Sequence, residues 1–238
     1  MFIKVILKLK GLGLWGAGKE TFEADVITFK TKVFSGITTI AIPGSYIKGL
    51  LRSWAYKIAP LLSKEKLISA SINPMCCVKE PCKECIVCKV FGASGEALSP
   101  LEISNFYSLK ADVLSKVKGK RLEELLQEDD IWEAPRVLYL PHVRIYDLTM
   151  KASEGGLFTQ EIVHPGTLFL GEIRLYENLL GEVNEADARL LLILSLAQLN
   201  YSYVGRRTKA RVRVIEHDLS PSSRCYDMIR SLEGDYDD

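Results

Sequence analysis

Apolar and mixed positions alternate along the first ten residues of the chain. The wholly apolar set is Ile3, Val5, Leu7 and Leu9, and lysines occupy most of the other positions. Because neighbouring side chains of a strand point to opposite faces, this pattern predicts a β-strand with one buried face. Residues 210–216 alternate between apolar residues and arginine in the same way, and they predict the last strand of the fold.

Two stretches follow the helical period instead. Residues 45–59 carry apolar side chains every three or four positions, and Pro60 follows as a normal stop. Residues 185–199 begin after Asn184, a suitable N-cap, and are apolar almost all round in their second half. We therefore expect the second helix to be buried.

The predicted elements follow the order strand, helix, several strands, helix, strand. This order suits an α+β fold with helices on one face of an antiparallel sheet, and a ferredoxin-like βαββαβ core with insertions is its simplest version. No interdomain linker is visible, so we expect one domain over residues 1–238. Residues 69–92 form a cysteine-rich insertion and 104–140 a helical one. Residues 153–168 belong to a hairpin that turns at 165–166 and continues to 176.

The composition excludes several classes of protein. Hydrophobic residues make up 47% and charged residues 26% of the chain, which argues against disordered, collagen-like and fibrous proteins. The densest apolar stretch, residues 190–197, is too short to span a bilayer. The first ten residues lack the apolar region of a secretory signal, so we expect a cytoplasmic protein with no membrane partner.

Charge is unevenly distributed although the net charge is only +1. Residues 1–66 contain 11 Lys/Arg and 4 Asp/Glu, and residues 201–214 contain five cations and no acid. Two basic segments on a nearly neutral chain indicate a local site for a polyanion. The alternative is a pair of solvated faces.

The segment IPGSYIKGLLRSW places Ser45, Lys48 and Arg52 on one face of the first helix. A helix start with free N–H groups, a hydroxyl and two cations suits a phosphate or a phosphodiester backbone. An ordinary amphipathic surface helix is the alternative.

A second basic element comprises Gly205, Arg206, Arg207 and Lys209. Glycine allows close approach of a ligand to the backbone, and arginine binds phosphate in a bidentate manner. Tyr201 and Tyr203 lie beside it and could stack on bases. A solvated turn with core tyrosines would give the same pattern.

Five of the six cysteines lie between residues 76 and 88, which favours a metal over a disulfide framework. Cys82, Cys85 and Cys88 are spaced for a tetrahedral zinc, and Cys77 (or its neighbour, Cys76) supplies a fourth thiolate. Such a zinc would be structural, because no position remains for water. Reduced, unliganded thiols are the alternative.

Asp25 lies in a loop near the basic segments. A carboxylate there can hold Mg²⁺ or another divalent cation, or accept a proton from a ribose hydroxyl. Without further context, a turn or cap role is the simpler interpretation.

Together these segments resemble the RAMP superfamily of CRISPR-associated proteins. The resemblance rests on IPGSYIKGLLR at 42–52, the CxxCxxCKVFG run at 82–92 and GGLFTQEIVHPGTLF at 155–169. It is strongest to the repeated backbone subunit of type III CRISPR effector complexes. The resemblance implies an RRM-like core, self-association along a CRISPR guide RNA, and other effector subunits as partners.

The resemblance also implies roles for individual residues. Ser45, Lys48 and Arg52 would contact guide phosphates, and Leu157 and Phe158 would be apolar tip residues of a thumb that wedges into the guide–target duplex. Asp25 matches the position of the family's catalytic aspartate, which implies metal-dependent cleavage of target RNA.

Two other roles stay open. The family often has a histidine in the first glycine-rich turn, where this chain has Leu14-Trp15. A non-catalytic structural or capping subunit is therefore one alternative. A guide-processing endoribonuclease is another. That enzyme usually relies on an N-terminal histidine, whereas the three histidines here are His142, His164 and His217.

Overall fold

The computed structural model describes residues 1–16, 18, 21–22, 24–70, 72, 81–93, 98–146, 150–205 and 208–233. In this part of the chain, the predicted α+β class is confirmed by a seven-stranded antiparallel sheet with the order β2-β3-β5-β8-β1-β9, in which β4 also pairs with β8. The strands are β1 (Phe2–Leu9), β2 (Lys30–Lys32), β3 (Thr38–Ile42), β4 (Leu101–Ile103), β5 (Phe106–Leu109), β8 (Leu168–Leu175) and β9 (Ala210–His217).

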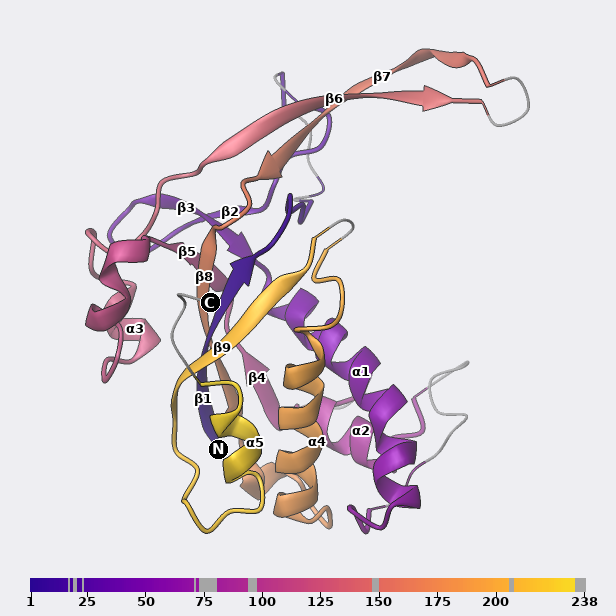
Figure 1. Cartoon of the computed structure of the whole chain (residues 1–238), viewed down its shortest axis with the longest axis vertical. Helices are drawn as coiled ribbons and strands as arrows, with labels where there is room; N and C mark the ends of the chain where they lie inside the picture. Colours follow the sequence, from indigo (N-terminus) through magenta and orange to yellow (C-terminus); the bar gives the residue numbers. More distant parts are fainter. Residues whose placement is uncertain are drawn as a thin grey trace.

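Helices cover one face of this sheet (Figure 1). They are α1 (Gly44–Lys64), α2 (Ile86–Phe91), α4 (Glu185–Gln198) and α5 (Tyr226–Arg230), and the 3₁₀ turn η2 (Glu177–Leu179) precedes α4. Along the chain, α1 follows β1 after the short strands β2 and β3, and α4 lies between β8 and β9. This is the predicted alternation of strands and helices, and the ferredoxin-like assignment stays a prediction.

Part of the opposite face is covered as well. The 3₁₀ turn η1 (Ala111–Lys116) and α3 (Leu122–Leu125) pack there with Trp132 against Ile6 of β1. Strand β1 is therefore buried on both faces along most of its length, whereas the alternation predicted one buried face. The difference arises because the insertion covers the second face as well. Lys4, a charged residue in the pattern, donates to the carbonyl oxygen of Val117 in this insertion and is only 1% exposed.

Helix α1 continues one turn beyond the predicted stop at Pro60. Proline removes an N–H donor, but Leu62 after it is buried in the main core and keeps the last turn packed. At the other end, a Cβ on Gly44 would lie 2.2 Å from the carbonyl oxygen of Ile103. The glycine therefore allows the start of α1 to approach β4 closely.

A separate two-stranded hairpin projects from one end of the molecule (Figure 1). It consists of β6 (Val137–Ile145) and β7 (Ala152–Val163), paired antiparallel with an irregularity between Val143 and Ile145. The sequence pattern paired the strand before Pro165-Gly166 with the strand after it. In the structure, β7 pairs with β6, because β8 is a central strand of the main sheet.

Among the described residues, no helix combines the length and the apolar character needed to cross a membrane.

Candidate nucleic-acid interface and metal centre

The first turn of α1 presents Ser45 to solvent. The N–H of Gly44 donates to Oδ1 of Asn105 at 3.0 Å, so this end of the helix is fixed to the segment before β5. The exposed hydroxyl is consistent with the predicted contact to a phosphate, and it is the most accessible member of the motif.

Lys48 is half-buried one turn further along α1. Its ammonium donates to Oγ of Ser99 at 2.6 Å and to the carbonyl oxygen of Leu101 at 2.8 Å. Burial, and secondarily the charge of Arg52, lower the pKa of Lys48. The ammonium is therefore positioned by β4, and it has one further proton with which to bind an anion.

Arg52 has a different set of partners. Its Nη2 donates to the hydroxyl of Tyr56 at 3.1 Å and lies 3.8 Å from Sγ of Cys88. The hydroxyl of Tyr56 is 3.6 Å from the same sulfur. Of the three residues that the sequence placed on one face, Arg52 is the one directed at the cysteine cluster.

The cysteine cluster lies at the start of α2. The sulfur atoms of Cys82, Cys85 and Cys88 all lie within 4.8 Å of one another, and the N–H of Cys85 is 3.4 Å from Sγ of Cys82. Sulfur ligands of a tetrahedral zinc lie about 3.8 Å apart, given zinc–sulfur bonds of about 2.3 Å. These three thiols therefore fit a metal ion, while Cys76 and Cys77 lie outside the described residues.

Part of the predicted cysteine-rich insertion is a regular helix. Residues 86–91 form α2, whose side chains Ile86, Val87, Val90 and Phe91 are buried in the main core. A metal bound by the three cysteines would therefore be attached directly to the core.

The second basic element lies beside β1. The turn at Gly205 is buried against the backbone of Leu14, and Lys209 is exposed, with its ammonium 5.6 Å from the ring of Tyr203. Tyr201 and Tyr203 are 78% and 59% exposed, so they are not the core tyrosines of the alternative interpretation. Arg206 and Arg207 lie outside the described residues.

Antiparallel pairing gathers more cations here than the sequence singled out. Lys8 of β1 pairs with Arg211 of β9, and the N–H of Lys10 donates to the carbonyl oxygen of Lys209 at 2.8 Å. Because strand side chains alternate, these four side chains share the face of Ile6, opposite to α1. We call them the β1/β9 cation cluster: Lys8, Lys10, Lys209 and Arg211. Only the pairing register reveals this cluster.

Asp25 is exposed and attached to β7. Its Oδ2 accepts the N–H of Thr159 at 2.6 Å, and its own N–H donates to the carbonyl oxygen of Thr159 at 3.0 Å. Among the described residues, no hydrogen bond to Oδ1 is present. The carboxylate is thus held in a defined place with one oxygen available for a ligand.

A second carboxylate belongs to Glu161, which lies two residues after Thr159 on β7. Glu161 is 2% exposed, accepts hydrogen bonds from the N–H and hydroxyl of Thr28, and pairs with the ammonium of Lys30 at 2.9 Å. Val26 forms a parallel bridge with Gln160, so the segment that follows Asp25 runs alongside β7 and reaches this ion pair at Thr28. Sequence reasoning missed Lys30 and Glu161, because a pair separated by 131 positions leaves no local pattern.

The hairpin carries the two predicted thumb residues on adjacent positions of β7. Leu157 is 72% exposed, whereas Phe158 is half-buried with its ring stacked on His142 at a centroid distance of 5.4 Å. Thr159, which holds Asp25, follows directly. Leu157, Phe158 and Thr159 are therefore three consecutive residues.

The RAMP superfamily model matches residues 14–210, which include the α1 motif, the cysteine cluster and the hairpin. The chain belongs to the RAMP superfamily. Among curated proteins, none matches it significantly.

A solved structure has a similar fold. It is a chain of the structure described as "Cryo-EM structure of the Type III-B Cmr-beta bound to cognate target RNA". The TM-score is 0.53 at 12% sequence identity, and the match covers 89% of the RAMP protein and 97% of that chain. At this identity, the likeness concerns the fold.

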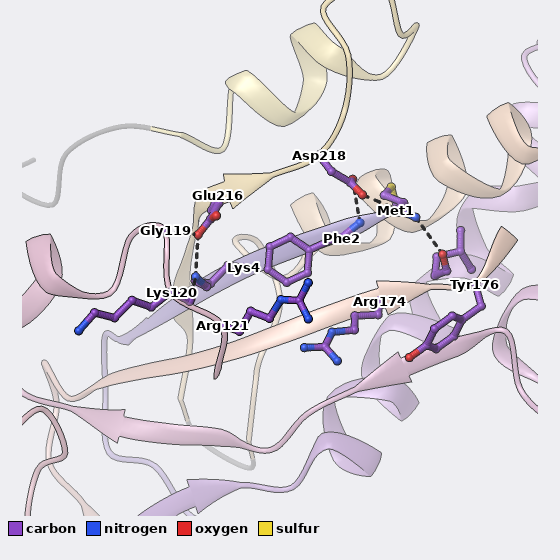
Figure 2. Close-up of a pocket in the computed structure, with 11 residues that line it drawn as sticks. Met1, Phe2, Lys4, Gly119, Lys120, Arg121, Arg174, Tyr176, Glu216 and Asp218 are labelled. Carbon is purple, nitrogen blue, oxygen red and sulfur yellow. Dashed lines mark hydrogen bonds and ion pairs between the residues drawn. The ribbon is translucent and has the colours of Figure 1, made fainter. Parts of the chain in front are cut away.

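The end of the sheet away from the hairpin holds a pocket of about 560 Å³ (Figure 2). Figure 2 shows Phe2, Arg121 and Arg174 at its centre, and Lys4 beside them. The ammonium of Lys4 donates to Glu216 at 2.6 Å, to the carbonyl oxygen of Val117 at 3.1 Å and to that of Lys120. In this RAMP protein the buried lysine thus fastens the insertion to the sheet.

Proposed function

We propose that this RAMP protein is a guide-RNA-binding backbone subunit of a type III CRISPR interference complex, and that it cleaves bound target RNA. The observation that carries the proposal is the arrangement on β7. An exposed apolar residue, Leu157, lies two positions from Thr159, which holds the carboxylate of Asp25. A strand that displaces a nucleotide would therefore bring a carboxylate to the adjacent phosphodiester.

The chemistry follows from displacing one nucleotide. A base turned out of the duplex lets its 2′-oxygen align with the adjacent phosphorus for in-line attack. The 2′-oxygen–phosphorus bond forms and the phosphorus–5′-oxygen bond breaks. Asp25 accepts the 2′-hydroxyl proton, and solvent supplies a proton to the 5′-oxygen. The products are a cyclic phosphate and a 5′-hydroxyl, and DNA is not cut because it lacks the 2′-hydroxyl.

Asp25 also fits a divalent cation such as Mg²⁺. Mg²⁺ keeps most of its ligands as water and substrate phosphate, so a single exposed carboxylate is a sufficient protein ligand. A bound ion would supply charge stabilisation for the phosphate oxygens. Asp25 would hold that ion, and Thr159 would fix the carboxylate through its N–H.

We place the guide strand over the sheet face that the insertion leaves open. The β1/β9 cation cluster would neutralise phosphates there, together with Arg206 and Arg207 of the second basic element. Gly205 would allow the phosphates to approach the backbone closely. Tyr201 and Tyr203 would stack on bases, since both rings are exposed. Ser45 and Lys48 would contact the backbone from the start of α1.

The remaining parts of the proposal concern the assembly. The fold likeness to a chain of a type III-B complex supports other effector subunits, a guide RNA and a target RNA as partners. We further propose that copies of the chain associate along the guide, that the metal is a structural zinc, and that the complex acts in the cytoplasm.

One observation favours a non-catalytic backbone or capping subunit as a second candidate. Asp25 makes two hydrogen bonds to Thr159 that attach the loop to β7, a purely structural contribution. In that case the chain would bind guide and target without cutting.

A cleavage assay separates the two candidates. The complex is assembled with the unmodified chain, Asp25→Ala or the control Asp129→Ala, which changes an exposed acid of the insertion. Matching RNA and Mg²⁺ are added, and the products are resolved on a gel. The proposal predicts a regular ladder that Asp25→Ala abolishes and Asp129→Ala retains, with unchanged RNA binding. A ladder that survives Asp25→Ala removes this residue from the reaction.

A further inference from the structure

We infer that Arg52 supports the metal centre by donating a hydrogen bond to the cysteine ligand Cys88, although its sequence motif assigns it to RNA. The inference rests on the proposed metal site and is independent of whether Asp25 is catalytic. Two contacts meet at Sγ of Cys88, which is fully buried: Nη2 of Arg52 at 3.8 Å and the hydroxyl of Tyr56 at 3.6 Å. A 3.1 Å hydrogen bond joins these two groups to each other.

The two α1 residues reach the sulfur because of helical spacing. Arg52 and Tyr56 are four positions apart and therefore lie one above the other on the helix. Arg52 also lies over the ring of Tyr56, with its Cζ 5.6 Å from the ring centroid. The guanidinium thus makes two contacts, with the hydroxyl and with the ring of Tyr56, a residue that itself contacts Cys88. These contacts define the position of a long side chain.

The chemistry of the donors matches a thiolate ligand. Metal-bound cysteines are deprotonated, and a zinc held by four of them carries a net charge of −2. Such a charge is costly beside a hydrophobic core unless cations and hydrogen-bond donors face it. Arg52 supplies a permanent positive charge and Tyr56 supplies an O–H donor, both at the same sulfur.

This assignment links the metal to the proposed RNA interface. Ser45 and Lys48 lie on the same helix within two turns of Arg52. Contacts of Arg52 and Tyr56 with the cluster would fix the rotation of α1 about its axis, and with it the direction of Ser45 and Lys48. Metal loss should therefore weaken RNA binding even though no ligand of the metal touches RNA.

The test separates metal binding from phosphate contact. The full chain is prepared with zinc as wild type, Arg52→Ala, Tyr56→Phe and the control Lys57→Ala, an exposed cation of α1 that contacts the ring of Trp54. Zinc affinity is measured by competition with a chromogenic chelator. RNA affinity is measured against salt in zinc-saturated protein, using a single-stranded RNA of guide length.

We expect Arg52→Ala to weaken zinc binding about 10- to 100-fold, and Tyr56→Phe to weaken it less, while Lys57→Ala changes nothing. The salt dependence of RNA binding should stay that of the wild type. A salt slope reduced by about one phosphate contact in zinc-saturated Arg52→Ala overturns the inference, whatever happens to zinc. So does an unchanged zinc affinity. Wild-type protein that folds without binding zinc also overturns it, but leaves the cleavage assay of Asp25 unaffected.

Discussion

Asp25 and Thr159 form a reciprocal pair across 134 residues of sequence: Oδ2 of the aspartate accepts the N–H of Thr159, and the aspartate N–H donates to the carbonyl oxygen of Thr159. The pair joins the proposed reactive carboxylate to the strand that carries Leu157. The position of the carboxylate relative to a displaced nucleotide is therefore determined by β7.

The pair predicts that stability and cleavage respond differently to two substitutions. Asp25→Asn keeps an oxygen acceptor for Thr159, so its free energy of unfolding should stay within about 0.5 kcal/mol of the wild type, whereas Asp25→Ala should lose about 1 kcal/mol. Both should abolish cleavage, because neither carries the negative charge with which a carboxylate accepts the proton and attracts a cation. Urea denaturation and the cleavage gel measure the two effects. Cleavage by Asp25→Asn at the wild-type rate would contradict the role of the carboxylate.

Substitutions of Leu157 and Phe158 should affect stability differently, although both residues were predicted to wedge into the guide–target duplex. Leu157→Ala should leave stability within about 0.5 kcal/mol, since the side chain is 72% exposed, and should reduce target cleavage. Phe158→Ala should cost stability, because it removes the ring stacked on His142. Thermal denaturation and cleavage of the same variants test this. If Leu157→Ala cuts normally, that leucine does not displace the nucleotide.

Lys4 should be among the costliest single side chains to remove. Lys4→Met would leave two carbonyl oxygens without their donor and Glu216 without its cation, for a loss of about 3 kcal/mol in the free energy of unfolding. Lys8→Met, four positions along β1, is the matched control and should cost much less. Similar urea midpoints for the two variants would refute the structural role of Lys4.

Acid should destabilise the fold through Glu177. The hydrogen bonds from Arg189, which outweigh the effect of burial, lower the pKa of Glu177 below its ordinary value of 4.5. A depressed pKa in the folded state stabilises the protein above pH 4.5, and this contribution is lost as the pH falls through the folded pKa. The urea midpoint should therefore drop below pH 4.5, and Glu177→Gln should flatten that drop. An equally steep drop in the variant would assign the effect to other groups.

Metal removal should destabilise the region around α2. Cys88→Ser replaces a buried ligand that Arg52 and Tyr56 contact, so it should lower both zinc content and melting temperature. Cys225 is a buried cysteine next to α5, and Cys225→Ser should leave the zinc content unchanged. Metal analysis of the purified variants measures this. Metal-free wild-type protein with an unchanged melting temperature would refute a structural zinc.

Local patterns predicted the elements that depend on local physics. The periodicity of 45–59 and 185–199 located α1 and α4, and the spacing of Cys82, Cys85 and Cys88 located the cluster. Strand β6 was missed: Pro141 interrupts its pattern, and its partner β7 is recognisable only from the three-dimensional pairing.

Long-range pairs account for the rest of what was missed. Lys4 looked like a solvent-facing residue until the insertion covered it, and the Lys30–Glu161 pair joins two distant segments. The β1/β9 cation cluster depends on register. Sequence alone identified the two basic segments that contribute to it, but not their shared face.

Crosslinking of the assembled complex tests the central claim most directly. Guide RNA carrying 4-thiouridine is crosslinked by ultraviolet light, and the modified peptides are identified by mass spectrometry. The account predicts crosslinks at Tyr201, Tyr203 and the first turn of α1. Crosslinks confined to the pocket around Phe2 and Tyr176, at the other end of the sheet, would contradict it.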